Sequence, residues 1–295
     1  MENYDQNIQW FPGHMTRAKR KIQANLKLVD IVAEVIDSRI PLSSRNPDLD
    51  NILGNKPRVV LLNKCDMADK IQTSKWIEYF KSKSIKALGI DCKSGKGVDK
   101  FFSAINDVLS EKIQVWKKKG MGGRNVRVMI VGVPNVGKSS LINRLVPKMK
   151  SKAKAEDRPG VTRGNQWFTL GNGFEVLDTP GVLWPKFDDA TTGMYLAFTG
   201  AIKDQVVDTQ ELASNLLEVL KSEYRNDVLT RYKLDENEVK NLSGHDLLTK
   251  IAKKRGMLMS GGELDLERAS IMILDEFRAA KIGRITLERL DDIDG

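Results

Sequence analysis

The chain has 295 residues, of which 41% are hydrophobic and 29% are charged, and this balance is typical of a folded globular protein. Lysine and arginine outnumber aspartate and glutamate by 48 to 39, which gives a formal net charge of +9 and favours an anionic partner. Two cysteines, Cys65 and Cys92, exclude a disulfide scaffold, so we expect a reducing, cytoplasmic setting. The sequence shows neither a signal peptide nor an apolar stretch of the roughly 18 residues that span a bilayer, and we expect no membrane association.

Short apolar runs alternate with helical patterns over the first 185 residues, which predicts a mostly parallel, Rossmann-like α/β sheet. The expected strands are 31–37, 58–63, 86–90, 126–132, 165–170 and 173–178. The expected helices include 16–29, 73–83, 98–117 and 139–145. Residues 117–124 are basic and glycine-rich, so we expect a flexible linker there. From residue 188 the pattern is helical, which predicts an α/β domain over 1–187 and a small all-helical domain over 188–295.

The strongest chemical signal is the run from Gly132 to Ser139, a complete G-x-x-x-x-G-K-S phosphate loop. It follows an apolar strand and opens a helix, which is the context that this motif requires. Successive backbone N–H groups in such a loop surround an anion, and the helix dipole adds a favourable potential. We expect Lys138 to neutralise the β- and γ-phosphates and the Ser139 hydroxyl to bind Mg²⁺.

Two later segments complete a site for a phosphate and its metal ion. Asp178 and Gly181 belong to an Asp-x-x-Gly run at the end of an expected strand. The carboxylate is suited to hold Mg²⁺ through a water, and the glycine N–H is suited to contact the γ-phosphate. Between this run and the phosphate loop, the Thr162 hydroxyl is the candidate for a further Mg²⁺ ligand, in a loop that orders around the γ-phosphate.

The base is predicted to be guanine. Asn63, Lys64 and Asp66 follow the apolar strand 58–63 as an Asn-Lys-x-Asp motif. A carboxylate at Asp66 accepts both the ring N1–H and the exocyclic amine of guanine, a pair of contacts that adenine does not offer. Asn63 is expected to brace the loop and the Lys64 stem to lie over the base. A further base contact is expected from the backbone around Cys92 and Lys93, after the next strand.

The order of these motifs is unusual, because the guanine motif precedes the phosphate loop. The chain therefore resembles a circularly permuted P-loop GTPase, in which a change of connectivity preserves the packed sheet. In this order the Asp178–Gly181 segment lies at the end of the GTPase domain and continues directly into the helical part. Nucleotide state is thereby connected to the second domain by position in the chain.

Four longer motifs make the resemblance more specific. They are 10–15 (WFPGHM), 37–41 (DSRIP), 179–185 (TPGVLWP) and 254–262 (KRGMLMSGG). Together they resemble the bacterial ribosome biogenesis GTPase A (YlqF/RbgA) family over nearly the whole chain. The resemblance implies a GTPase that binds a late precursor of the large ribosomal subunit, is slow alone and is stimulated by that particle. It implies that His14 positions the attacking water, since Val182, Leu183 and Trp184 follow Gly181, and that Asn135 helps to bind K⁺.

The expected nucleotide-binding residues are Asn63, Lys64, Asp66, Cys92, Lys93, Pro134, Asn135, Val136, Gly137, Lys138, Ser139, Ser140, Thr162 and Gly181. The expected ligands are GTP or GDP, Mg²⁺ held by Ser139, Thr162 and Asp178, and K⁺. The expected catalytic residue is His14. We expect a monomer whose partners are the rRNA and ribosomal proteins of the large-subunit precursor.

Basic residues are clustered at 17–21, 117–119, 144–163 and 250–255, which favours binding to phosphate backbones over a merely solvated surface. Two other classes of function stay open at this point. A metabolic P-loop kinase or ATPase is opposed by the Asn-Lys-x-Asp motif. A GTP-gated RNA-binding scaffold, in which hydrolysis is incidental, is kept open by the hydrophobic residues after Gly181.

Overall fold

The computed structural model describes residues 20, 22–146, 166–170, 172–179 and 190–292, and the expectations for His14, Thr162 and Gly181 lie outside them. The described residues fall into two units. The sheet unit comprises the residues up to 179 together with 288–292, and the helical unit comprises residues 190–287.

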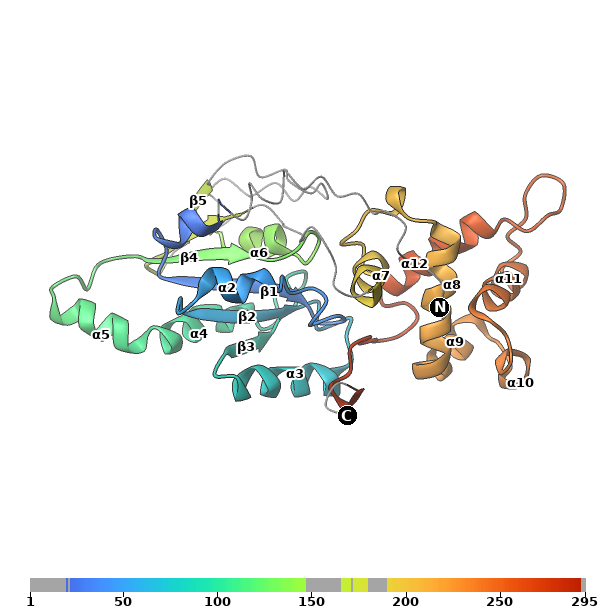
Figure 1. Cartoon of the computed structure of the whole chain (residues 1–295), viewed down its shortest axis with the longest axis horizontal. Helices are drawn as coiled ribbons and strands as arrows, with labels where there is room; N and C mark the ends of the chain where they lie inside the picture. The colour runs from blue at the N-terminus through green and yellow to red at the C-terminus, as the bar shows by residue number, and fades with distance from the viewer. Residues whose placement is uncertain (1–19, 21, 147–165, 171, 180–189, 293–295) are drawn as a thin grey trace. The chain divides into compact units, whose positions relative to one another are not determined.

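The sheet unit is built on six strands in the order β3-β2-β1-β4-β6-β5 (Figure 1). Every neighbouring pair is parallel except β5 and β6, which are antiparallel. The mostly parallel sheet predicted from the alternating pattern is confirmed. The strands are β1 (Ile31–Asp37), β2 (Arg58–Asn63), β3 (Lys86–Gly89), β4 (Val126–Val131), β5 (Gln166–Thr169) and β6 (Phe174–Asp178).

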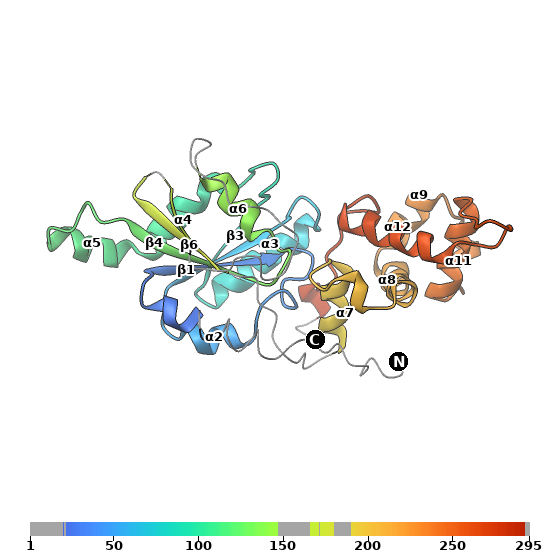
Figure 2. The ribbon, with the colours of Figure 1, turned by 90° about the horizontal axis from the view of Figure 1, so that it is seen from above.

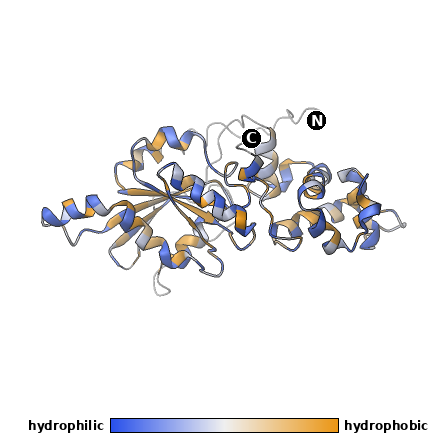
Figure 3. Cartoon of the chain, turned by 90° about the horizontal axis from the view of Figure 1, so that it is seen from below, coloured by the Kyte–Doolittle hydropathy of each residue, from blue (hydrophilic) through white to orange (hydrophobic). Residues whose placement is uncertain are grey.

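Helices cover both faces of the sheet, as the nearly continuous apolar strands require. One face carries α2 (Asp48–Leu53) and α3 (Lys70–Ser82), whose side chains pack on alternate residues of the central strands. Figure 2 shows α4 (Phe101–Val108) and α6 (Lys138–Leu145) on the side of the sheet opposite α2. In Figure 3 the strands are largely hydrophobic, whereas the helices combine a hydrophobic side with a hydrophilic one.

The helix expected over 98–117 is divided in the structure. A short 3₁₀ turn, η1 (Val98–Lys100), precedes α4, and a separate helix α5 (Ser110–Lys118) follows it. Leu109 lies between the two helices with non-helical backbone angles, and its side chain is buried. Helix α5 contains no buried residue, so the chain leaves the core of the sheet unit at this break. The expected linker is correspondingly shorter, since α5 continues to Lys118.

The helical unit is organised around one long helix, α8. Its buried leucines, Leu212, Leu216 and Leu220, contact the apolar sides of α11 and α12. A side chain at Gly244 would collide with the Ser214 carbonyl, so glycine allows α11 to begin directly against α8. The helices are α7 (Ala190–Phe198), η2 (Asp204–Val206), α8 (Thr209–Glu223), α9 (Arg225–Tyr232), α10 (Glu236–Val239), α11 (Gly244–Lys254) and α12 (Leu266–Arg278).

The predicted helical C-terminal region is confirmed. Side-chain caps explain why its helices begin where they do. The Asp208 carboxylate accepts hydrogen bonds from the first N–H groups of α8, and Ser243 forms a capping box with Asp246 at the start of α11. None of the helices formed by the described residues is long and apolar enough to cross a membrane.

The chain returns to the sheet unit after residue 287, whereas the sequence pattern assigned 288–295 to the helical domain. The Glu288 carboxylate accepts hydrogen bonds from the backbone N–H groups of Leu42 (2.5 Å) and Ser43 (2.9 Å) and from the Ser43 hydroxyl. The Trp76 indole donates to the Glu288 carbonyl at 2.8 Å, and Leu290, in η3 (Leu290–Asp292), joins the cluster under α3. This C-terminal segment is therefore packed as part of the sheet unit.

Glu288 makes the attachment of the C-terminal segment sensitive to pH. Burial raises the pKa of Glu288 to about 7, although its hydrogen bonds with Ser43 and Leu42 act in the opposite direction. The folded chain thus retains a proton that the unfolded chain has already lost. We therefore expect Glu288 to contribute most to the free energy of unfolding below about pH 4.5. As the pH rises from there towards 7, this contribution should fall by at most about 1.4 kcal/mol per pH unit.

Urea unfolding measured at several pH values tests this expectation by comparing wild type with Glu288→Gln, which cannot ionise. The variant should lose that part of the pH dependence. Glu78→Gln is the matched control, because Glu78 is exposed on α3, where it forms an ion pair with Lys81. A Glu288→Gln curve that keeps the wild-type slope between pH 5 and 7 would contradict the assignment.

Candidate functional site

The sequence motifs meet at one edge of the sheet. Because β1, β2, β3, β4 and β6 are parallel, their carboxyl ends lie at the same edge. In open α/β sheets, ligands bind at this edge. Asp37 ends β1, Asn63 ends β2, and Asp178 ends β6, while the phosphate loop follows β4. Motifs from both halves of the sequence are therefore brought together.

Two glycines give the phosphate loop its close packing. Gly132 has a φ of 154°, and a Cβ there would overlap the Val35 carbonyl of β1. Gly137 has a φ of 102°, and a Cβ there would overlap the Asn63 side-chain amide. Both positions thus need a residue without a side chain. The remaining loop residues Pro134, Val136, Ser139 and Ser140 follow in sequence up to and into the first turn of α6.

Lys138 is held inside the loop, where its Nζ donates to the Val133 carbonyl at 2.8 Å. Burial lowers the pKa of Lys138 to about 8, although the charge of the neighbouring Asp178 carboxylate acts to raise that pKa. A buried ammonium with a lowered pKa is poorly compensated by its surroundings. An incoming phosphate would supply the compensation, so this environment favours a polyanionic ligand.

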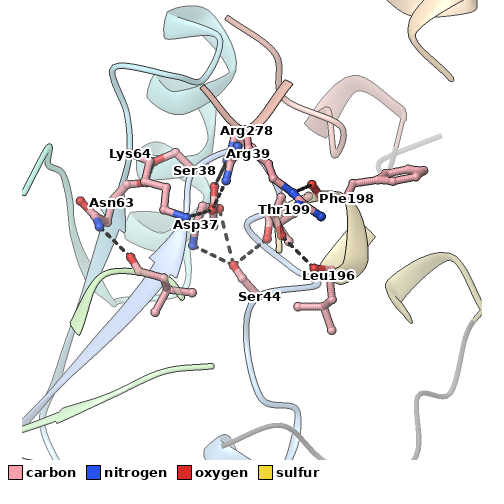
Figure 4. A network of polar contacts seen from close by, with 12 residues as sticks. Asp37, Ser38, Arg39, Ser44, Asn63, Lys64, Leu196, Phe198, Thr199 and Arg278 are labelled. Carbon is pink, nitrogen blue, oxygen red and sulfur yellow. Dashed lines mark hydrogen bonds and ion pairs between the residues drawn. The ribbon is translucent and has the colours of Figure 1, made fainter. Parts of the chain in front are cut away.

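The Asn63 side chain joins two loops that come from distant parts of the chain. Its amide Nδ2 donates to the Val136 carbonyl in the phosphate loop at 2.6 Å (Figure 4). Its Oδ1 accepts from the Cys92 N–H at 3.0 Å. Both functions of the amide are satisfied, and both partners are backbone groups. This Asn63 bridge fixes the phosphate loop against the loop that follows β3.

Lys64 and Asp66 have different environments in the loop after β2. Lys64 has a φ of 61°, and its ammonium lies 2.9 Å from the Asp37 carboxylate. The Asp66 Oδ1 atom is buried and has no hydrogen-bond partner among the described residues. A buried carboxylate oxygen without a donor is costly. The N1–H and amine of guanine are donors of the kind that this atom lacks.

The Asp37–Arg39 pair was not identified from the sequence as part of the site. Arg39 Nε and Nη2 contact the Asp37 carboxylate at 2.9 and 2.8 Å, and both residues are buried (Figure 4). Burial acts to raise the pKa of Asp37, but the charges of Arg39 and Lys64 hold that pKa well below its usual range. The available signal was an acidic and a basic residue placed directly after an apolar strand. Asp37 thus orients the Lys64 ammonium.

The loop after β3 is organised by Asp91. Its carboxylate accepts from the N–H groups of Lys93 (2.7 Å) and Ser94 (3.2 Å), and Arg144 of α6 donates to the Lys93 carbonyl at 2.8 Å. The N–H groups of Cys92 and Lys93 are therefore already used within the protein. Burial raises the pKa of the Cys92 thiol to about 12, so the thiol stays protonated. A base contact from this loop would have to come from its other atoms.

The possible magnesium ligands lie on neighbouring elements. Ser139 is in the first turn of α6, and Asp178 ends β6 opposite Ile130 of β4. The adjacent Thr179 hydroxyl donates to the Ile130 carbonyl at 2.6 Å, which holds this strand end in place. One hydroxyl and one carboxylate suit Mg²⁺, which binds few protein ligands and keeps waters and phosphate oxygens. No cluster of three or more His, Cys, Asp or Glu residues suited to a metal occurs in the described part of the chain.

Both the sequence and the fold are similar to those of known GTPases. A family model described as "50S ribosome-binding GTPase" matches residues 127–248. Ribosome biogenesis GTPase A of Priestia megaterium is 48% identical over 95% of this chain and 96% of its own length. The Thermotoga maritima protein of the same name is 35% identical over 97% of this chain and 96% of its own length. Among solved structures, GDP-bound YlqF from T. maritima has a TM-score of 0.66 and 30% identity, with 92% of this chain and all of that chain covered.

Replacing Asn63 tests whether its bridge organises the site. Asn63→Ala leaves the Val136 carbonyl and the Cys92 N–H without their partner. Each lost buried hydrogen bond costs about 1–3 kcal/mol. We expect the dissociation constant for a fluorescent GDP analogue to rise by about tenfold or more. Asn51→Ala, an exposed position on α2, is the control and should bind as wild type does. Equal affinity in Asn63→Ala and wild type would argue against the role of the bridge.

The lowered pKa of Lys138 predicts a pH dependence of nucleotide affinity. The bound phosphates favour the charged form, and free protein above about pH 8 has the neutral form. Binding then requires uptake of a proton, so affinity should be constant below pH 8 and fall by up to about tenfold per pH unit above it. Calorimetry of GDP binding between about pH 7 and pH 9, in buffers of different ionisation enthalpy, measures both the affinity and the proton uptake. A pH-independent affinity without proton uptake would contradict this prediction.

Proposed function

Because the chain belongs to the ribosome biogenesis GTPase A family, we propose that it binds and hydrolyses GTP to control the maturation of a late precursor of the large ribosomal subunit. The Asn63 bridge is the observation that carries the nucleotide part of the proposal. It joins the phosphate loop to the base-binding loops, so that one nucleotide can be held by both. The names of the relatives support the ribosomal part.

Guanine is selected by the loop after β2. In this proposal the buried Asp66 oxygen accepts hydrogen bonds from the base, and the Lys64 stem lies against the ring. The Asp37 carboxylate, itself held by Arg39, restrains the Lys64 ammonium at 2.9 Å. Adenine offers an acceptor at N1 in place of a donor, so it would leave Asp66 unsatisfied.

The phosphates are bound by the loop N–H groups and by Lys138, whose charge is better compensated when a polyanion is present. Ser139 and Asp178 would hold Mg²⁺, which supplies neutralisation of the phosphate charge. The further roles proposed for Thr162 as a metal ligand, Gly181 as a γ-phosphate contact and His14 as the residue that positions water concern positions outside the described residues. Asn135 is exposed in the phosphate loop with a φ of 59°, and K⁺ binding beside it is part of the same proposal.

The helical domain is the proposed contact with rRNA and ribosomal proteins. The C-terminal end of α11 exposes Lys253, Lys254 and Arg255, and cations there suit both a helix C-terminus and an anionic partner. We further propose that the protein acts as a monomer in the cytoplasm. Hydrolysis, slow in isolation and stimulated by the particle, would release the protein from it.

The decisive experiment is GTP hydrolysis by the full chain with and without large ribosomal subunits, in K⁺ and in Na⁺, at two salt concentrations. We expect strong stimulation by subunits that weakens as salt rises, since phosphate contacts are screened. ATP in place of GTP should give little turnover. His14→Ala should keep nucleotide affinity and lose most of the stimulated rate.

Each arm has an outcome that would count against its part of the proposal. Tight GTP binding without stimulation would favour the scaffold in which hydrolysis is incidental. A preference for ATP would remove the guanine assignment. Full stimulated turnover in His14→Ala would remove the role of His14, and equal rates in K⁺ and Na⁺ would remove the role of K⁺.

A further inference from the structure

A second concave site lies at the edge of the sheet opposite the phosphate loop. It is a cleft of about 270 Å³ between α5, the connection that follows it and the turn before β6. The strands β4 and β6 begin here, at Val126 and Phe174, and they end at the phosphate loop and at Asp178. A strand of this length separates the two edges by about 20 Å. We call this site the linker cleft.

On one side of the linker cleft, α5 and the connection that follows it contribute little to the core. Helix α5 has no buried residue, and Figure 1 shows it extending beyond the sheet. Val115 and Met121 are apolar and remain 47% and 45% exposed. Gly122 and Gly123 have almost no neighbouring atoms where a side chain would stand, so the rim of the cleft is open. The chain therefore maintains a projecting, accessible structure that packing alone does not require.

One wall of the linker cleft is formed by two planar groups. The Arg124 guanidinium lies 4.4 Å from the centre of the Trp116 ring and is also held by the Asp30 carboxylate at 3.0 Å. Indole rings and guanidinium planes are the surfaces on which proteins stack unpaired nucleobases. Asn106 and Asn172 also line the cleft, and their amides are suited to hydrogen-bond the edge of a base.

The surroundings of the linker cleft are positively charged. Lys117, Lys118 and Lys119 are exposed at the end of α5, and Lys117 lines the cleft itself. The nearby carboxylate of Asp30 is paired with Arg124, and that of Glu175 with Arg127. Arg127 in turn lies over the Trp167 ring, which is 38% exposed. Exposed cations interleaved with aromatic rings favour a phosphate backbone that carries unstacked bases.

We propose that the linker cleft binds one unpaired nucleotide of RNA, with the base against the Trp116–Arg124 wall and the flanking phosphates on Lys117–Lys119. An acidic protein segment would use the charges but would leave the planar wall and the amides unused, so the observations favour RNA. The inference rests on the proposed association with rRNA and adds a contact at the far edge of the GTPase sheet.

Fluorescence anisotropy of the full chain with a labelled oligouridine of about 12 nucleotides tests the proposal. Trp116→Leu should weaken binding by about fivefold to a hundredfold, because a stacking surface is lost. Trp116→Phe keeps a ring and should retain most of the affinity. A triple replacement of Lys117, Lys118 and Lys119 by alanine should weaken binding. It should also make the negative slope of log affinity against log salt less steep by about two. An RNA duplex of the same length should bind less tightly.

The matched control is a triple alanine replacement of Lys70, Lys81 and Lys83, which removes the same charge from exposed positions on α3 and at its C-terminal cap. It should leave RNA affinity close to wild type, and all variants should bind GDP and unfold in urea as wild type does. Equal RNA affinity in Trp116→Leu and wild type would overturn the inference, as would equal competition by polyglutamate and oligouridine. Neither result would touch the proposed GTPase function. If wild type bound neither oligouridine nor large ribosomal subunits, the proposed function itself would fail.

Discussion

The arrangement of the nucleotide edge depends on two hydrogen bonds of one side chain. Asn63 donates to the Val136 carbonyl and accepts from the Cys92 N–H, so three loops after three strands share one amide. The two partners lie 73 and 29 residues from Asn63 along the sequence, and the folded sheet brings them together. The buried amide joins them, and the directionality of its hydrogen bonds fixes the position of one loop against the other. The glycine at 137 is part of the same constraint, because the amide occupies the space of a side chain there.

The charged side chains near the base site are held in place by the buried carboxylate of Asp37. The Asp37 carboxylate is bound by Arg39 and Lys64, and the Asp37 backbone N–H donates to the Ser44 hydroxyl oxygen at 2.9 Å. The cost of burying this charge is offset because both oxygens of the Asp37 carboxylate have cationic partners. The loop after β1 and the loop after β2 are thereby locked together. The phosphate edge shows the complementary situation, since the buried charge there is the Lys138 ammonium, which lies near the Asp178 carboxylate.

The sequence was most informative where local pattern decides structure. β1 and β2 have the bounds that their apolar runs predict, because buried parallel strands are continuous hydrophobic segments. The phosphate loop was predictable because its spacing has few alternatives. The break at Leu109 was not, since an apolar residue at helical spacing gives no sign that its backbone leaves the helix. The contacts of Glu288 with Ser43, and of Asp37 with Lys64, were also beyond reach, because they join segments whose proximity only the folded sheet creates.

The return of residues 288–292 to the sheet unit changes the topological status of the helical unit. It is an insertion with two covalent attachments to its host, and it is not a tail with one. A unit that is joined to its host by two connections has less conformational freedom than one joined by a single connection. A single backbone cleavage in either connection would leave the helical unit tethered. Force or strain arising at one attachment would also be transmitted through the helices to the other, back to the domain in which it began.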